Sequence, residues 1–330
     1  MSMTIRTLAS GILICLFTGV TSASAPLPSW NDGPVKQAIL AFAEQAADPA
    51  SPKHVPGSDR IAVFDNDGTL WPENPLPFQL AFVIDELKRR LPDNPAWKDN
   101  PLVMAAVEGR METILAGGTR ALIELLDLTH ADVTTEEFDR RVRGWLKSAT
   151  HPRFERRYDT LGYAPMLELL NFLRSKGFKT YIVSGGGQDF MRVWAETVYG
   201  IPPEWVIGSY ARTEYALIEG KPTLTKRPGV EFIDDKAGKP VAIDRFIGRR
   251  PIAAFGNSDG DKAMLEWTTI DRPNTLGVIV HHTDEAREYA YDSAPKSTGK
   301  LVEALQDASK RGWLVIDMKK DWNRVFRTDR

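Results

Sequence analysis

The chain has 330 residues, with 42 lysines and arginines against 44 aspartates and glutamates, five histidines and one cysteine. A formal charge of −2 lacks the basic excess of a general nucleic-acid-binding surface, and 42% hydrophobic with 26% charged residues is typical of a folded globular protein. One cysteine excludes an intrachain disulfide framework and a cysteine-rich zinc site, and the length predicts two domains or one α/β domain with a large insertion.

Residues 1–25 have the features of a signal peptide. Arg6 supplies the positive charge, Leu8–Val20 is an apolar stretch of 13 residues, and residues 21–25 are small, as a cleavage site requires. The apolar stretch is too short to span a bilayer comfortably, and a buried N-terminal helix is the alternative. We therefore expect an exported protein, periplasmic or secreted, without a stable membrane anchor; its mature form would have lost Cys15.

The next part of the chain predicts one helix, one strand and then only helices. Asp32 is placed to cap a helix over 35–47, and Ile61–Phe64 is a short apolar run typical of a buried strand. Helical periodicity then continues through residues 76–149. The four predicted helices of this region cover 78–91, 101–116, 119–129 and 134–148.

From residue 150 onward, amphipathic helices alternate with short apolar strands. The predicted helices cover 165–175, 189–199, 241–247, 262–267 and 299–311. The predicted strands cover 179–183, the region near 206, 215–218, 252–255, 276–280 and the run 313–318. This alternation predicts an α/β fold, a Rossmann-like doubly wound parallel sheet formed by 26–75 and 150–330, with 76–149 inserted as a helical cap. In such a sheet, ligands bind at the carboxyl ends of the strands.

Two carboxylates follow the first strand directly, in the segment Asp65-Asn66-Asp67-Gly68-Thr69. Carboxylates this close repel each other unless a cation lies between them, and carboxylate and carbonyl oxygens suit Mg²⁺. A calcium loop is excluded because its twelfth position would be Leu76 instead of glutamate. A plain Asp-Gly turn remains the alternative.

Three later segments also connect a strand or loop with a helix. In Ser184-Gly185-Gly186-Gly187, the glycines allow a phosphate to approach backbone amides, although glycine turns of this kind are common. Residues 234–240 contain Lys236 and Lys239, and a lysine at a helix start is usually a solvated surface charge. The segment 255–265 contains a second acidic loop, in which Asp261 could simply cap the next helix.

The order of these four segments resembles the haloacid dehalogenase superfamily of phosphohydrolases, and within it the phosphoserine-phosphatase-like branch. Residues 65–69 fit the family pattern Asp-x-Asp-Gly-Thr, Ser184 and the glycines after it are similar to the branch's Ser-Gly-Gly motif, and 256–261 align with Gly-Asp-x-x-x-Asp. The resemblance covers about residues 61–280. It departs at Asn257, where the family usually has aspartate.

The resemblance implies a role for each of these residues. Asp65 would attack phosphorus, and Asp67 would protonate the leaving oxygen and then activate water. Ser184 and a lysine would stabilise the phosphoryl oxygens. We prefer Lys239 for this lysine because it immediately precedes the helix before the fourth segment, and Lys236 is the alternative.

The resemblance also implies a Mg²⁺ site. Its ligands would be Asp65, the backbone carbonyl of Asp67 and the side chain of Asn257, with Asp261 as a ligand or as support for one. Because the carboxamide of Asn257 has one negative charge less than the usual aspartate, Mg²⁺ would bind more weakly, or more of the ligation would shift to Asp261 or Asp259.

Substrate contacts are expected from Thr69, Glu73, Gly185 and Gly186. Glu73 could bind a cationic group of the substrate, although an ion pair between cap and core is at least as good an interpretation. His281-His282 has no partner at metal-ligand spacing, so we expect a structural role, and we interpret the nine tryptophans as packing residues.

The sequence thus predicts a Mg²⁺-dependent phosphomonoesterase that hydrolyses small phosphate esters through a phospho-aspartate. Two alternatives stay open: transfer of the phosphoryl group to an acceptor other than water, and an exported protein that binds phosphate esters with weak catalysis. Asn257 is the feature that favours the second alternative. The expected partner is a small phosphorylated substrate, not nucleic acid.

Overall fold

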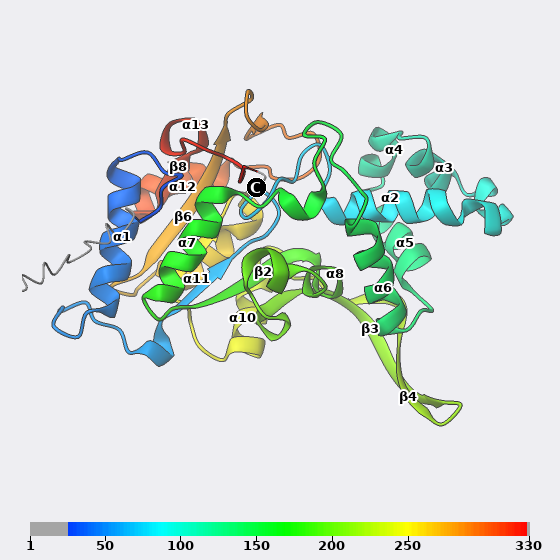
Figure 1. Ribbon diagram of the computed structural model, residues 1–330, viewed down its shortest axis with the longest axis horizontal. Helices are drawn as coiled ribbons and strands as arrows, with labels where there is room; N and C mark the ends of the chain where they lie inside the picture. Colours follow the sequence, from blue (N-terminus) through cyan, green and yellow to red (C-terminus); the bar gives the residue numbers. More distant parts are fainter. Residues whose placement is uncertain (1–25, 329–330) are drawn as a thin grey trace, which may run out of the picture.

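A computed structural model describes residues 26–328, which form an α/β fold around one eight-stranded sheet (Figure 1). The predicted signal peptide lies outside the described residues. The strands are β1 (Ile61–Phe64), β2 (Lys179–Gly187), β3 (Val206–Ile218), β4 (Lys221–Phe232), β5 (Ala253–Gly256), β6 (Leu276–Thr283), β7 (Ala290–Tyr291) and β8 (Leu314–Asp317). Their order is β4-β3-β2-β1-β5-β6-β7, and β8 also pairs with β6. The pairs among β3, β2, β1, β5, β6 and β8 are parallel, which confirms the predicted fold class.

Helices cover both faces of the parallel strands. On one face, Ala62 and Phe64 of β1 belong to an apolar cluster with α1 (Pro34–Ala47) and α7 (Ala164–Ser175). On the other face, Ile61 and Val63 pack with α10 (Gly238–Ile247), α11 (Lys262–Thr269) and α12 (Glu303–Arg311). Successive side chains of a strand point to opposite faces, so an uninterrupted apolar run such as β1 is buried on both sides.

Five helices occupy the chain between β1 and α7 and lie to the right of the sheet in Figure 1. They are α2 (Phe78–Arg90), α3 (Pro101–Val107), α4 (Met111–Ala116), α5 (Gly118–His130) and α6 (Thr135–Leu146). Helices α2 to α5 share an apolar cluster of their own, whereas the buried residues of α6 belong to the main core. All five fall inside the range predicted for the cap.

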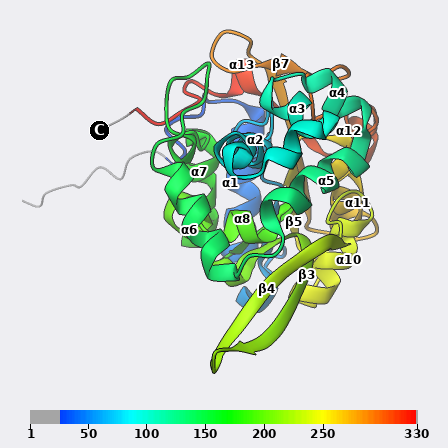
Figure 2. The same ribbon diagram turned by 90° about the vertical axis from the view of Figure 1, so that its right-hand side faces the viewer.

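Strands β3 and β4 form a long antiparallel hairpin that projects from the body of the molecule (Figure 2). The prediction of short separate strands near 206 and 215–218 is wrong, because β3 runs without a break over 13 residues and pairs with the 12-residue β4. The connection is Glu219-Gly220, both with positive φ (49° and 76°), as a two-residue hairpin turn of this hand requires. These two residues were the signal for a hairpin.

Other differences concern helix boundaries. Asp32 does not cap α1: Gly33 is the N-cap, and the Asp32 carboxylate instead accepts a hydrogen bond of 2.9 Å from Lys36. The predicted helix over 101–116 is broken at Gly109, which has a φ of +76°, and α12 begins at Glu303 rather than at 299. The predicted helix over 189–199 is two short helices, α8 (Gln188–Arg192) and α9 (Ala195–Tyr199).

The remaining elements are short. They are α13 (Met318–Asp321) and the 3-10 turns Gly57–Asp59, Leu91–Asp93, Pro95–Asp99, Tyr158–Thr160, Pro203–Trp205 and Asp259–Asp261. Among the described residues, no helix combines the length and the apolar character needed to cross a membrane.

Candidate active site

The adjacent strands β2, β1 and β5 bring the chemically interesting segments to one edge of the sheet. All three are parallel, so their carboxyl ends coincide, and the backbone N–H of Asp65 donates to the Phe255 carbonyl of β5 at 2.9 Å. The glycine segment differs from the expected turn. Strand β2 continues through Gly187, with an irregular register against β3 between Ser184 and Gly187.

Lys239 lies at the centre of a buried charge cluster. Its ammonium donates to Asp65 Oδ1 at 2.8 Å, to Asp261 Oδ1 at 2.6 Å and to the Val183 carbonyl at 2.9 Å. The side chain is 2% exposed, whereas Lys236 lies on the surface. The structure therefore brings Lys239, and not Lys236, to the predicted nucleophile.

The cluster perturbs the ionisation of its members. Burial, and then the charge of Asp261, raise the pKa of Asp65 to about 8, although Lys239 works in the opposite direction. Burial works against the charged ammonium of Lys239, but the carboxylates of Asp261 and Asp65 outweigh it and raise its pKa above the ordinary value. When Asp65 and Asp261 are both ionised, their charges exceed that of the Lys239 ammonium by one negative charge at this edge of the sheet.

Asp67 lies beside this cluster and is held by a tryptophan. Trp71 Nε1 donates to Asp67 Oδ1 at 2.7 Å, and the Trp71 ring stacks on Trp194 with centroids 4.0 Å apart. Burial raises the pKa of Asp67 to about 6. A carboxyl group with a pKa near neutrality can both donate and accept a proton, as an acid–base catalyst must. Trp71 thus does more than pack.

Gly186 separates Asp67 from Ser184. A Cβ atom added to Gly186 would lie 3.4 Å from Asp67 Oδ2 and 3.5 Å from Ser184 Oγ, so both side chains flank the same small space. The Ser184 hydroxyl accepts a hydrogen bond of 3.2 Å from the Gly186 N–H. Gln79 of α2 closes the space from the cap, since its Oε1 accepts from the Gly187 N–H at 2.7 Å. Gly185 is exposed, and its carbonyl accepts from Ser209.

The carboxamide of Asn257 is held from two sides. Its Oδ1 accepts from the Thr69 hydroxyl at 3.0 Å, and its Nδ2 donates to Glu73 Oε1 at 2.6 Å. Gly68, between these partners, has a φ of +76°, and a Cβ there would overlap with Asn257 Nδ2 and Glu73 Oε1. Only glycine fits both the conformation and the space.

Glu73 is buried at 3% exposure, and burial raises its pKa to about 8. It lies among partners from the C-terminal part of the chain rather than in an ion pair between cap and core. Tyr291 donates to its Oε1 at 2.8 Å, and Thr298 donates to its Oε2 at 2.7 Å. A substrate contact by Glu73 stays a prediction.

The two acidic residues of the fourth segment, Asp259 and Asp261, accept hydrogen bonds from other groups of the protein. Asp261 accepts from the Asn257 and Ser258 amides at 2.9 and 3.0 Å through Oδ2, while Lys239 takes Oδ1. Asp259 accepts from the amides of Val302 and Ala304 at 3.0 and 2.9 Å, at the start of α12. Asp261 is therefore placed to support Asn257, and Asp259 holds a helix end.

His282 is a site neighbour that sequence reasoning missed. Its Nε2 lies 2.7 Å from the Gly68 carbonyl and its Nδ1 lies 3.0 Å from Glu288 Oε2. Burial alone would lower the pKa of His282, but its hydrogen bond with Glu288 and the charge of Glu288 outweigh burial and raise it. A histidine at the carboxyl end of β6 lies on the same edge of the sheet as Asp65, and that position was the available signal. For Gln79, Tyr291 and Thr298 there was no comparable signal.

The oxygen atoms at this edge fit a hard cation. Asp65 Oδ2 makes no hydrogen bond with any described residue, and the loop that carries Asp65 and Asp67 contacts Asn257 through Thr69. Carboxylate, carbonyl and carboxamide oxygens are the donors that Mg²⁺ prefers. Within residues 26–328, no group of three or more His, Cys, Asp or Glu side chains could hold a metal ion. The expected donor set contains at most two carboxylates, those of Asp65 and Asp261, so it differs from such a group.

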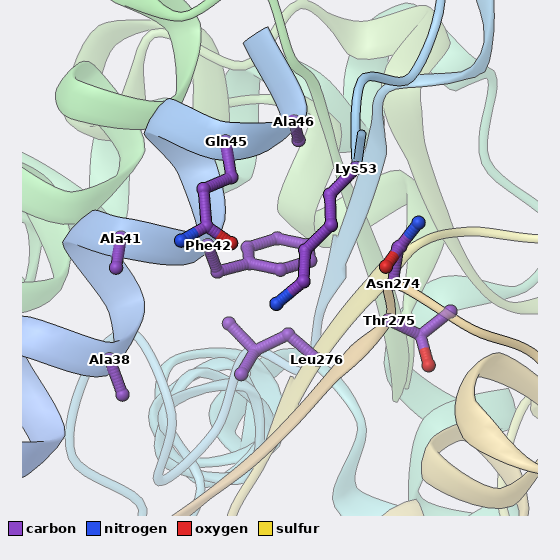
Figure 3. Close-up of a pocket in the computed structure, with 9 residues that line it drawn as sticks. All are labelled: Ala38, Ala41, Phe42, Gln45, Ala46, Lys53, Asn274, Thr275 and Leu276. Carbon is purple, nitrogen blue, oxygen red and sulfur yellow. The ribbon is translucent and has the colours of Figure 1, made fainter. Parts of the chain in front are cut away.

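A separate pocket of about 330 Å³ lies at the opposite edge of the sheet, between α1 and the start of β6 (Figure 3). Phe42, Lys53 and Leu276 are among its lining residues. Because β6 begins at Leu276, this pocket lies at the amino ends of the parallel strands, away from Asp65. It shares no residue with the candidate site.

The parallel sheet, with buried acidic residues at the carboxyl ends of its strands, defines the chain as an α/β protein with an acidic site of the kind that hydrolases have. The family model for haloacid dehalogenase-like hydrolases matches residues 62–266, more than half of the chain. The protein belongs to this family. No match was found among curated proteins.

The solved structures that match this chain share little of its sequence. A conserved protein of unknown function from Anaerococcus prevotii DSM 20548 has a TM-score of 0.54 and 16% identity, covering 86% of this chain and 92% of that one. A protein of unknown function from Bordetella pertussis Tohama I has a TM-score of 0.49, 16% identity and coverage of 78% and 98%. A phosphoserine phosphohydrolase-like protein from Francisella tularensis subsp. tularensis SCHU S4 has a TM-score of 0.36, 17% identity and coverage of 76% and 98%. At 16% identity, the similarity to the Anaerococcus prevotii protein concerns the fold alone.

Proposed function

We propose that this protein is a Mg²⁺-dependent phosphomonoesterase that hydrolyses small phosphate esters through a phospho-aspartate at Asp65. One observation carries the proposal: two buried carboxyl groups follow β1, one bonded to the Lys239 ammonium at 2.8 Å and the other held by Trp71 with its pKa raised to about 6. The first is suited to attack, and the second is suited to proton transfer.

In the first step, the oxygen of the Asp65 carboxylate that does not bind the cation forms a bond to phosphorus while the bond to the ester oxygen breaks. Asp67 gives its proton to the departing oxygen. In the second step, Asp67 takes a proton from water, the water oxygen attacks phosphorus, and the bond to Asp65 breaks to release inorganic phosphate. The Ser184 hydroxyl, across Gly186 from Asp67, is placed to donate to a phosphoryl oxygen.

The residues that would hold Mg²⁺ are Asp65, the carbonyl of Asp67 and Asn257 through Oδ1. When bound there, Mg²⁺ offsets the repulsion between the anionic nucleophile and the anionic phosphate. Asp261 supports this arrangement through its bonds to Lys239 and the Asn257 amide.

The phosphoserine-phosphatase-like branch is our proposal for the closer relationship, supported by Ser184 and the glycines after it. Export to the periplasm or outside the cell is likewise proposed, on the charge, apolar stretch and small residues of 1–25. Thr69, Gly185 and Gly186 are proposed to lie near the bound phosphate. Asn257 also favours a second candidate, a binding protein with weak catalysis, because the carboxamide lacks the charge of the usual aspartate.

The test is hydrolysis of a broad panel of phosphomonoesters by the mature chain, with Mg²⁺ and with a chelator. We expect Mg²⁺-dependent release of inorganic phosphate, and a loss of nearly all activity in Asp65→Asn, which should stay folded. Added alcohols report phosphoryl transfer, because a phosphorylated alcohol would then appear in place of phosphate. Tight binding of esters without release of phosphate would instead support the binding protein.

A further inference from the structure

The Asn257 carboxamide can present either its oxygen or its NH₂ group to a cation, and only the oxygen is a ligand. The neighbour of the carboxamide decides between the two orientations, because an oxygen atom that accepts hydrogen bonds faces the NH₂ group. Glu73 Oε1 lies 2.6 Å from Asn257 Nδ2. The NH₂ group therefore faces Glu73, and Oδ1 faces Thr69 in the loop that carries Asp65 and Asp67.

Glu73 is itself fixed by the C-terminal part of the chain. The hydroxyl groups of Tyr291 and Thr298 donate to its two oxygens at 2.8 and 2.7 Å. A Cβ at Gly299, where φ is +88°, would overlap with Glu73 Oε1, so the chain passes directly against the carboxyl group. Three groups thus donate hydrogen bonds to Glu73, and no ion pair is found for it among the described residues.

We propose that Glu73 is a positioning residue for the cation site, which turns the Asn257 carboxamide so that its oxygen, and not its NH₂ group, faces the cation. This inference rests on the proposed function and assigns to Glu73 a role other than the binding of a substrate cation. It also explains how asparagine can stand where the family usually has aspartate. Tyr291 and Thr298 contribute indirectly, because their hydrogen bonds hold Glu73 in place.

The experiment is a double-mutant cycle on the affinity for Mg²⁺, measured by calorimetry on the purified chain without substrate. Glu73→Gln should weaken binding about tenfold, since groups that orient metal ligands typically contribute about ten- to hundredfold in affinity. Asn257→Asp should also weaken it, although aspartate adds a negative charge, because the change removes the NH₂ donor to Glu73 and the two carboxyl groups would then turn away from each other. The double variant reverses the polarity of this hydrogen bond, because the new amide at position 73 donates to the new carboxylate at position 257. Its affinity should therefore lie within about threefold of the wild type.

Two further variants keep the result interpretable. Tyr291→Phe removes one donor to Glu73 without touching Asn257, and we expect a loss of about threefold. Glu168→Gln is the matched control: Glu168 accepts from Ser29 at 2.6 Å, outside the candidate site, and the affinity of this variant for Mg²⁺ should equal that of the wild type. Thermal unfolding in a chelator shows that each variant is folded.

Each outcome decides the inference. Nearly unchanged affinity in Glu73→Gln, independent effects of the two single changes, or no binding of Mg²⁺ by the wild type would overturn it. An unchanged affinity together with a raised KM for cationic esters alone would assign Glu73 to the substrate instead. Coupled Mg²⁺ affinities in a chain that hydrolyses no ester would refute the proposed function and leave this inference standing.

Discussion

The surroundings of Lys239 show that it belongs to a buried charge cluster and is not a solvated surface charge. Its ammonium bridges two buried carboxylates, and removal of one partner from such a cluster leaves uncompensated buried charge. We expect Lys239→Met to lower the free energy of unfolding by about 3–5 kcal/mol and to abolish hydrolysis.

Lys236→Met is the matched control, because Lys236 lies three positions earlier and is exposed. Its free energy of unfolding and its turnover should stay close to wild type in denaturant titrations and initial-rate assays. Loss of activity in this variant, with activity retained in Lys239→Met, would reverse the assignment.

Asp67 has two proposed tasks that a change of leaving group can separate. With an alkyl phosphate, departure of the ester oxygen needs a proton, so Asp67→Asn should reduce turnover by about 10²–10⁴-fold. With an activated aryl phosphate, the phenolate leaves without protonation, so formation of the phosphoenzyme should be much less affected. Single-turnover kinetics with both esters measures this difference; equal losses would contradict the acid role of Asp67.

At the scale of elements, the loop after β1 depends on a glycine that makes room for Asn257 and Glu73. Gly68 and Gly220 have the same φ of +76°, but a Cβ at Gly68 overlaps with side chains while nothing lies within 4 Å of one at Gly220. We expect Gly68→Ala to lower the free energy of unfolding by about 2–4 kcal/mol and Gly220→Ala by about 1 kcal/mol. Equal losses in thermal unfolding would mean that φ alone, and not the close approach, requires glycine at 68.

The elements also show where sequence patterns were sufficient. The buried strand at 61–64 and the helix near 165–175 have clear apolar patterns and matched the structure closely. Strand β4 has no clear apolar pattern, because much of its alternation is polar, as expected for a hairpin that projects into solvent. The turn Glu219-Gly220 is its main sequence signal. The helix over 101–116 was predicted as one because its apolar periodicity continues across Gly109.

At the scale of the whole molecule, the sequence predicted which strand ends meet but not what packs behind them. Asp65 and Asn257 follow β1 and β5, and Ser184 lies near the end of the adjacent parallel strand β2, so topology alone brings them together. Tyr291 and Thr298 reach Glu73 from 218 and 225 positions further along the chain, and no local pattern encodes such a contact. The position of Tyr291 and Thr298 beside Glu73 depends on how the C-terminal segment packs against the rest of the fold.

Buried carboxyl groups make the stability of the molecule depend on pH. Burial raises the pKa of Asp234 from 3.8 to about 7, so the folded state retains a proton that the unfolded state loses, and stability falls as the pH rises from about 4 to 7. Asp234→Asn removes this contribution. Relative to wild type, it should gain stability between about pH 4.5 and pH 8, with an upper limit of roughly 4 kcal/mol from about 3 pKa units. A pH-independent difference in denaturant titrations would contradict this.

The central claim is that Asp65 carries the phosphoryl group, and trapping it tests the claim most directly. The Asp67→Asn variant, mixed with an activated aryl phosphate labelled at phosphorus and quenched in acid, should accumulate phosphoenzyme because the water-activating step is slowed. We predict label on the tryptic peptide 61–88, which contains Asp65, and its release by hydroxylamine, as an acyl phosphate requires. Label on another peptide, or release of product in the wild type without any labelled protein in the variant, would contradict the account.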